Sequence, residues 1–190
     1  VMPSLEPLER VRAETSALTC MLAASSLEPA LPGYGRRTTL IVSKGISDEL
    51  RWFYEARFGM FVHFGLYALI GKNEWVMYFD RIPRRKYAKL MDVFNPTGFV
   101  ADAWVDIARN AGAKYIAVTA KHCDGFCLFD SQLTDYKITN TPFRRDLIGE
   151  LVEACHKSDM KIVLYYSQPD WHHPNYVNLK GAFKDLQNPP

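Results

Sequence analysis

The segment from Thr119 to Ser131, TAKHCDGFCLFDS, places a lysine, a histidine, two cysteines and two aspartates at the end of the apolar run KYIAVTA. Burying charge is costly unless the charge is paired or used. Side chains of these types can bind a metal ion, supply a thiol nucleophile, or form a polar cup for a small hydrophilic substrate. The three readings require different partners elsewhere in the chain.

A metal site is the first reading. Zinc needs three or four His, Cys or carboxylate ligands at convergent positions. His63, His122 and His172 each follow an apolar run and could converge, but no H-x-H or H-x-x-x-H spacing supports them. We therefore expect no metal ligand here.

A thiol nucleophile is the second reading, with Cys123 as the nucleophile and His122 or His63 as its base. Adjacent residues of a strand point to opposite faces, so His122 is expected to be badly placed as the base of Cys123. A reactive cysteine also needs a lowered pKa. This reading is the weakest of the three.

A cup for a sugar explains more of the residues. Sugars offer hydroxyl groups and an apolar ring patch, and they suit a mixture of fixed donors and aromatic faces. The alternative for the two tryptophans of the set is that they are core residues. The candidate residues near the strand ends are His63, Glu74, Trp75, His122, Tyr165 and Trp171.

The elements that position these residues follow from hydrophobic patterning. Apolar runs over residues 58–65, 114–120 and 161–167 predict strands, and helical periodicity predicts helices over 99–112 and 145–158. Continuously apolar strands alternating with helices are typical of a parallel sheet, which binds ligands at the carboxyl ends of its strands. No glycine-rich phosphate-binding motif stands at a strand-to-helix turn.

The remaining segments are less regular. Residues 47–57 predict a short helix, 66–83 an irregular region and 86–94 a helix, while the basic segment 81–89 is expected to be a solvated turn and helix face. Residues 1–45 show no lasting period and are expected to be an atypical, disordered leader. The domain itself is expected over residues 46–190.

Composition narrows the function. The chain has 190 residues and a net charge of +2, which gives no electrostatic reason to bind nucleic acid. No apolar run reaches the about 18 residues of a membrane span. The four cysteines form no disulfide framework or zinc-finger spacing. The segment SALTCMLAASS is flanked by acidic residues, unlike a signal peptide, so the sequence does not determine localisation.

Several motifs, taken together, resemble a known family. RFGMFVHFGLYAL, NEW, AGAKYIAVTAKHCDGFCLFDS, TDYKITNTPFRRDLIGELVEAC and LYYSQPDWHHPNY resemble the N-terminal half of the catalytic barrel of glycoside hydrolase family 29, the α-L-fucosidases, over residues 52–176. The resemblance implies an α/β fold, a (β/α)8 TIM-like barrel of which the first three or so strand–helix units are present. It also implies a retaining exo-glycosidase that removes terminal α-L-fucose from glycans or small substrates, without a cofactor. Family members are often secreted, periplasmic or lysosomal.

The resemblance also assigns binding residues one by one. The family's F-x-H-[WF]-G motif falls on His63, and its K-H-H-D-G-F motif begins at Lys121, with its first histidine at His122. The second histidine of that motif, a sugar ligand in the family, is Cys123 here, and a thiol is a much weaker hydrogen-bond partner. With Trp171 from the residue-based reasoning, the expected substrate-binding set is His63, Glu74, Trp75, His122, Cys123, Tyr165 and Trp171.

The catalytic carboxylates are expected elsewhere. A retaining mechanism needs two carboxyl groups about 5 Å apart, and the resemblance places the nucleophile and the acid/base beyond Pro190. We expect the present chain to be inactive alone, and we assign no catalytic role to Glu74, Asp124, Asp130 or Asp170. The alternatives are a non-catalytic carbohydrate-binding half barrel and a metal-dependent barrel hydrolase.

Overall fold

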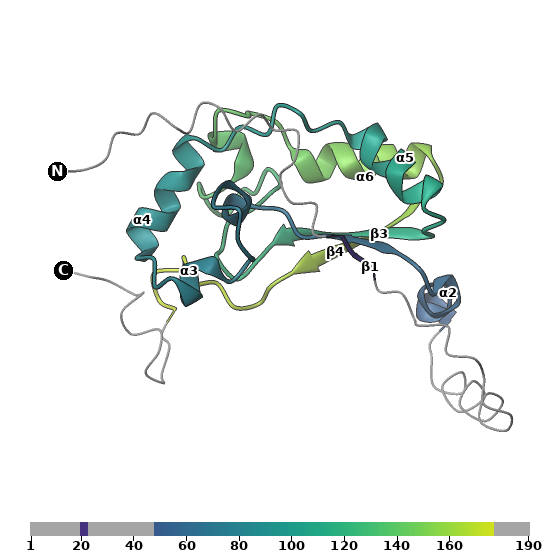
Figure 1. Ribbon diagram of the computed structural model, residues 1–190, viewed down its shortest axis with the longest axis horizontal. Coiled ribbons are helices and arrows are strands. Elements are labelled where there is room, and N and C mark those ends of the chain that lie inside the picture. The colour runs from purple at the N-terminus through teal and green to yellow at the C-terminus, as the bar shows by residue number, and fades with distance from the viewer. Residues whose placement is uncertain (1–19, 23–47, 177–190) are drawn as a thin grey trace, which may run out of the picture.

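The computed structural model describes residues 20–22 and 48–176 (Figure 1). The leader expected over residues 1–45 lies outside the described residues except for Cys20–Leu22, which form an edge strand. The expected domain over residues 46–190 is described for the greater part of its length.

A sheet forms the centre of the described fold. Its strands are β1 (Cys20–Leu22), β2 (Met60–Val62), β3 (Tyr115–Lys121) and β4 (Lys161–Tyr166), side by side in that order. β2, β3 and β4 are parallel, as predicted, and β1 runs antiparallel to β2. The predicted strand over 58–65 is wrong in its extent, because only Met60–Val62 pair with β3.

Two helices cover one face of this sheet (Figure 1). α5 (Ala101–Asn110) joins β2 to β3, and α6 (Leu147–Lys157) joins β3 to β4, close to the predicted ranges. The N-cap of α6 is Asp146, whose carboxylate accepts a hydrogen bond of 2.7 Å from the backbone N–H of Gly149. The α/β class predicted from the sequence is confirmed, and the described strands form an open sheet.

The core lies between the sheet and these helices. Ile116 and Val118 of β3 are fully buried there. On a strand, alternate side chains point to opposite faces, so Met60 and Val62 of β2 join this core while Phe61 faces the other side of the sheet. The helix residues in the core are Val105, Ala108, Leu147, Ile148, Leu151, Ala154 and Cys155.

The connection from β2 to α5 is more ordered than predicted. The segment 66–83, expected to be irregular, contains η2 (Leu66–Leu69) and α3 (Val76–Phe79), and α4 (Arg84–Ala88) and η3 (Lys89–Asp92) follow. α3 and α4 lie beyond the carboxyl ends of β3 and β4, whereas α2 (Asp48–Ala56) lies at the opposite end of the sheet (Figure 1). The basic segment 81–89 is not wholly solvated, because Tyr87 is buried within it.

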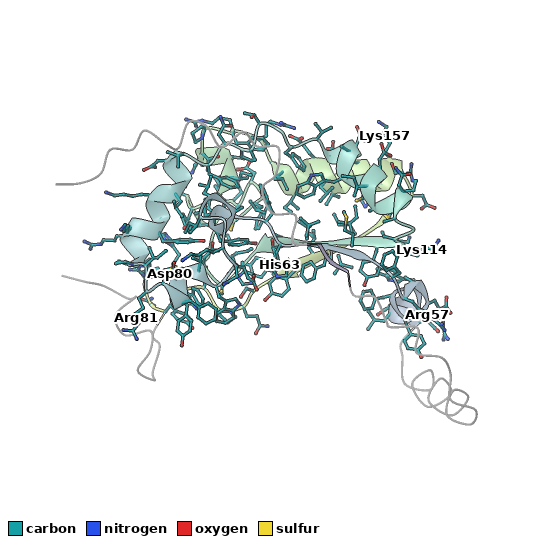
Figure 2. The ribbon with its side chains drawn as sticks, viewed as in Figure 1. Arg57, His63, Asp80, Arg81, Lys114 and Lys157 are labelled. Atoms are coloured by element: carbon teal, nitrogen blue, oxygen red, sulfur yellow. The ribbon has the colours of Figure 1, made fainter. Side chains whose placement is uncertain are left out.

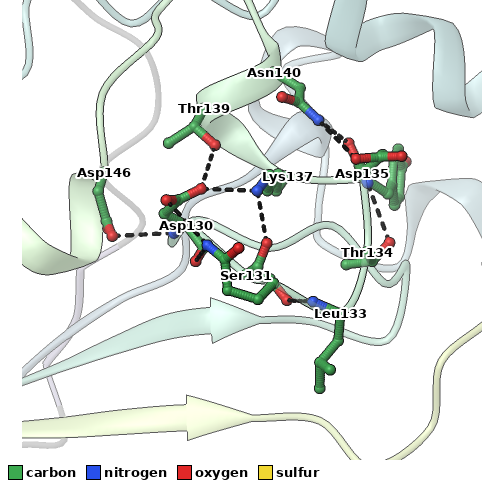
Figure 3. A network of polar contacts seen from close by, with 11 residues as sticks. Asp130, Ser131, Leu133, Thr134, Asp135, Lys137, Thr139, Asn140 and Asp146 are labelled. Carbon is green, nitrogen blue, oxygen red and sulfur yellow. Dashed lines mark hydrogen bonds and ion pairs between the residues drawn. The ribbon is translucent and has the colours of Figure 1, made fainter.

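A polar network fixes the long loop between β3 and α6 (Figure 3). The carboxylate of Asp130 accepts hydrogen bonds from Lys137 at 2.8 Å and from Thr139 at 2.9 Å, the latter in η4 (Ile138–Asn140). The backbone N–H of Asp130 donates to Asp146 at 3.0 Å. The residue that caps α6 therefore also anchors the loop.

Apolar surface remains exposed on β4. Leu164 and Tyr166 are each about half exposed, and no strand among the described residues pairs with the outer edge of β4. None of the helices in the described ranges is both long and apolar enough to cross a membrane.

Candidate functional site

Aromatic and imidazole rings gather where β2, β3 and β4 end. His63 follows β2 and lies near the centre of Figure 2, at the ends of the strands. His122 follows β3, and Tyr165 is the second-to-last residue of β4. We refer to these three rings together with Trp75 and Trp171 as the ring cluster.

The first three rings of the cluster lie against one another. The ring centroids of His63 and His122 are 5.6 Å apart, and His122 stacks on Tyr165 at 5.5 Å. Phe61 supports them, since its ring lies 4.3 Å from that of His63. Because Phe61 and His63 are two residues apart on an extended chain, they share the face of the sheet opposite the helices.

The two tryptophans extend the cluster across α3 and the loop after β4. Their ring centroids are 5.2 Å apart, and Trp75 lies 6.4 Å from His122. Trp171 is buried, whereas 39% of Trp75 is exposed. Trp75 is therefore not a core residue, and one of its surfaces is accessible to a ligand.

Glu74 adds a carboxylate to the two imidazoles. One ligand atom from each of His63, Glu74 and His122 lies within 4.8 Å of the other two. Burial lowers the pKa of His63, and burial together with the neighbouring His63 lowers that of His122 to about 4. Both imidazoles are neutral at pH 7, so each offers one donor and one acceptor, as hydroxyl recognition requires.

Cys123 contradicts the geometric argument made from the sequence. Its Sγ lies 3.1 Å from Nδ1 of His122, although the two residues were expected to face apart. The chain leaves β3 at Lys121 and turns, so strand alternation no longer applies. Burial raises the pKa of the Cys123 thiol to about 12, which keeps it protonated and unsuited to act as a nucleophile.

The three histidines that were weighed as a metal set do not form one group. His172 stacks on Tyr136 with ring centroids 3.9 Å apart and faces that loop. In the described ranges, the group that brings three ligand atoms together is His63, Glu74 and His122. The third residue of this group is Glu74, and not His172 as the sequence argument considered.

The loop after β4 is fastened to the loop after β3. Buried Lys121 pairs with Asp170 at 3.4 Å, and the backbone N–H of Trp171 donates to the carbonyl of Cys123 at 2.8 Å. Arg84 of α4 donates to the carbonyls of His172 and His173, both at 3.2 Å. These contacts set the position of Trp171.

Gly125 permits this close approach. Its φ of +84° lies in the left-handed region, and a Cβ there would come within 2.3 Å of an Asp170 carboxylate oxygen. Glycine is therefore required here for two reasons, the left-handed turn of the loop and the close approach of Asp170.

Asp124 holds the loop after β3 in place. Its carboxylate is fully buried and accepts hydrogen bonds from the Tyr87 hydroxyl at 2.9 Å and the backbone N–H of Phe126 at 3.2 Å. Burial raises the pKa of Asp124 to about 6. The hydrogen bond between the Tyr87 hydroxyl and the Asp124 carboxylate connects α4 to the loop that carries His122.

The structure brings all seven residues of the expected binding set into one region, and it adds others that sequence reasoning missed. Tyr67 lies edge-on to His122 at 6.0 Å, and its hydroxyl hydrogen-bonds Thr119 at 3.2 Å. Tyr78 lies near both tryptophans. Tyr78 follows Trp75 by three residues, a spacing that places side chains on one helical face and could have indicated it.

Comparisons with known proteins agree on one family. The family model for α-L-fucosidase matches residues 38–188. The tissue α-L-fucosidase of Mus musculus is 33% identical over 151 residues, which cover 70% of this chain and 33% of the relative. The plasma α-L-fucosidase of Homo sapiens is 31% identical over 149 residues, 69% of this chain and 32% of the relative.

Solved structures give the same result. The α-L-fucosidase isoenzyme 1 of Paenibacillus thiaminolyticus is 46% identical with a TM-score of 0.69, over 75% of this chain and 35% of that one. The α-L-fucosidase of Lactobacillus casei in complex with its α-L-fucose product is 42% identical with a TM-score of 0.64. That match covers 68% of this chain and 44% of the other. The chain spans about a third of the length of the curated relatives that it matches.

Proposed function

This chain belongs to the α-L-fucosidase family, glycoside hydrolase family 29, and from that premise we propose that its ring cluster binds a terminal α-L-fucose residue of a glycan or small glycoside. The observation that carries the proposal is the juxtaposition of two neutral imidazoles, a carboxylate and exposed aromatic surface at the carboxyl ends of parallel strands. Ligands of parallel α/β folds bind at this end.

The chemistry of the side chains divides the task. Nitrogen atoms of His63 and His122 donate to and accept from sugar hydroxyls, and the Glu74 carboxylate accepts from a hydroxyl. Trp75 and Tyr165, each about two-fifths exposed, pack against the apolar part of the sugar. Trp171 is buried behind Trp75 and supports it. Cys123 is buried and contacts His122, so we assign it the task of orienting that ring.

The reaction is retaining hydrolysis of the fucosidic bond in a closed barrel. It requires a carboxylate nucleophile and an acid/base about 5 Å apart. Three carboxylates of this region have other partners: Glu74 lies beside the imidazoles of His63 and His122, Asp124 is hydrogen-bonded to Tyr87, and Asp170 is paired with Lys121. We therefore keep the assignment of the two catalytic carboxylates to positions beyond Pro190.

The test is hydrolysis of an aryl α-L-fucoside by the protein translated to its natural stop codon. His122→Ala is expected to lower kcat/KM about tenfold to a hundredfold, because an unmade hydrogen bond in a buried site costs about 1–3 kcal/mol. His156→Ala on the exposed face of α6 is the matched control and leaves kcat/KM unchanged.

The outcomes separate the alternatives. Turnover that depends on His122 supports a fucosidase. Fucose binding without turnover in the full-length protein would replace it with a carbohydrate-binding module. Near-normal kinetics in His122→Ala would remove the ring cluster from the proposed site.

A further inference from the structure

Two histidines of the ring cluster and the neighbouring Glu74 form a ligand set of a kind that binds zinc. The nitrogen donors come from His63 after β2 and His122 after β3, and the oxygen donor comes from Glu74 before α3. Two histidines and one glutamate, with a fourth position left open, are the protein ligands in one class of zinc sites. We propose that His63, Glu74 and His122 bind a divalent transition-metal ion, and that metal and sugar exclude each other from this site.

The spacing of the ligand atoms supports the proposal. A tetrahedral zinc ion with bonds of about 2.0–2.2 Å holds its ligand atoms about 3.3 Å from one another. The three atoms here lie within 4.8 Å of one another. Any two of the three atoms therefore have to approach each other by at most about 1.5 Å, the difference between 4.8 Å and about 3.3 Å, a distance that side-chain rotation can supply.

The orientation of His122 supports it further. Metal-binding histidines use one ring nitrogen for the metal while the other is held by a neighbouring group. Nδ1 of His122 is 3.1 Å from the Sγ of Cys123, and the ring stacks on Tyr165. These contacts fix the ring and leave Nε2 as the nitrogen available to a ligand.

The surrounding charges permit a cation. Glu74 contributes one negative charge to the set. Lys121, a buried cation next to His122 in the sequence, is already paired with Asp170 at 3.4 Å and lies over the ring of Tyr166. Its charge is therefore compensated locally, and repulsion of a second cation is weakened.

The donor types predict which metals bind. Imidazole nitrogens favour Zn²⁺, Cu²⁺, Ni²⁺ and Co²⁺ over Mg²⁺ and Ca²⁺, which prefer all-oxygen sites. We expect the order Cu²⁺ above Ni²⁺ above Co²⁺ and no binding of Mg²⁺ at this position. Exclusion of sugar rests on the proposed function, because His63, Glu74 and His122 are the groups assigned to the fucose hydroxyls.

The experiment is calorimetric titration of the full-length protein with ZnCl₂ in a non-coordinating buffer, without sugar. His63→Ala, Glu74→Gln and His122→Ala are each expected to weaken Zn²⁺ binding at least about tenfold, while His156→Ala leaves it unchanged. Circular dichroism checks the fold of each variant, and Glu74→Gln preserves the shape of the side chain should an alanine variant fail to fold. Absorption of the Co²⁺ form in the visible range reports the ligand geometry.

Competition is measured in the same titration. With L-fucose at about ten times its own Kd, the apparent Kd for Zn²⁺ is expected to rise about elevenfold. The metal site would be overturned if the wild type failed to bind Zn²⁺. It would also be overturned if all three variants bound Zn²⁺ as tightly as the wild type. Fucose binding by the wild type, measured without metal, shows separately whether the proposed function holds. A Zn²⁺ affinity that saturating fucose leaves unchanged would refute the exclusion.

Discussion

Replacing Gly125 by alanine tests how the two loops of the site are held together. A Cβ at this position would lie 2.3 Å from the Asp170 carboxylate and 2.7 Å from Cβ of His172. The Asp170 carboxylate can be relieved only by turning away from Lys121, and the Cβ of His172 is held by the backbone, so the loop after β4 has to move. Because that loop carries Trp171, we expect Gly125→Ala to displace part of the ring cluster.

The magnitude follows from two contributions. An alanine at a φ of +84° costs about 1–2 kcal/mol relative to glycine. Displacing Asp170 leaves the buried ammonium of Lys121 without its partner, which costs about 3–5 kcal/mol for a fully buried pair. Because the side chain of Asp170 is 31% exposed and solvent screens the pair, we expect its loss to cost about 2 kcal/mol. We expect a total loss of about 3–4 kcal/mol in the free energy of unfolding.

Gly112 provides the matched control. Its φ of +83° is nearly the same, but a Cβ there meets no atom within 4 Å. Gly112→Ala is therefore expected to lose only the backbone contribution of about 1–2 kcal/mol. The assays are urea unfolding of both variants and fucose binding by calorimetry. Equal destabilisation of the two variants, or unchanged fucose affinity in Gly125→Ala, would refute the reasoning.

Two further predictions concern the network in Figure 3. Asp146→Ala removes the N-cap of α6 and the acceptor for Asp130 N–H, and urea unfolding is expected to show a loss of about 1–2 kcal/mol. The hydrogen bond from Lys137 holds the pKa of Asp130 below its usual 3.8. A carboxyl whose folded pKa is lowered stabilises the fold above 3.8, and this contribution is lost as the pH falls through the folded value. Asp130→Asn is thus expected to be less stable than the wild type near pH 7, with the gap narrowing as the pH falls below 3.8; a constant gap would contradict the linkage.

The local pattern predicted the parallel sheet and its two covering helices well. Apolar residues at helical spacing gave α5 and α6, and continuous apolar runs gave β3 and β4. These elements depend on burial along one segment, which the sequence expresses directly. β2 was predicted too long because its aromatic run continues beyond the residues that pair, and pairing depends on the neighbouring strand.

The candidate site could likewise be predicted in part. Polar residues just after strands indicated which side chains meet, since parallel strands bring their carboxyl ends together. Partner choice could not be predicted, because it depends on distant segments: Asp124 bonds Tyr87, 37 residues away, and Lys121 pairs with Asp170, 49 residues away. The same dependence made His172 face Tyr136 instead of His63.

Cys123 illustrates both what the sequence indicates and what depends on the folded chain. A histidine at this position would be a strong hydrogen-bond partner, whereas the thiol is a weak one and is almost fully buried. The thiol nevertheless touches Nδ1 of His122, so what it retains is influence over the orientation of that ring. Under the proposed function, we expect the weak thiol at position 123 to leave a larger share of the hydroxyl recognition to His63 and Glu74. These are the two residues that complete the metal ligand set with His122, so sugar affinity and metal affinity are expected to depend on the same three side chains.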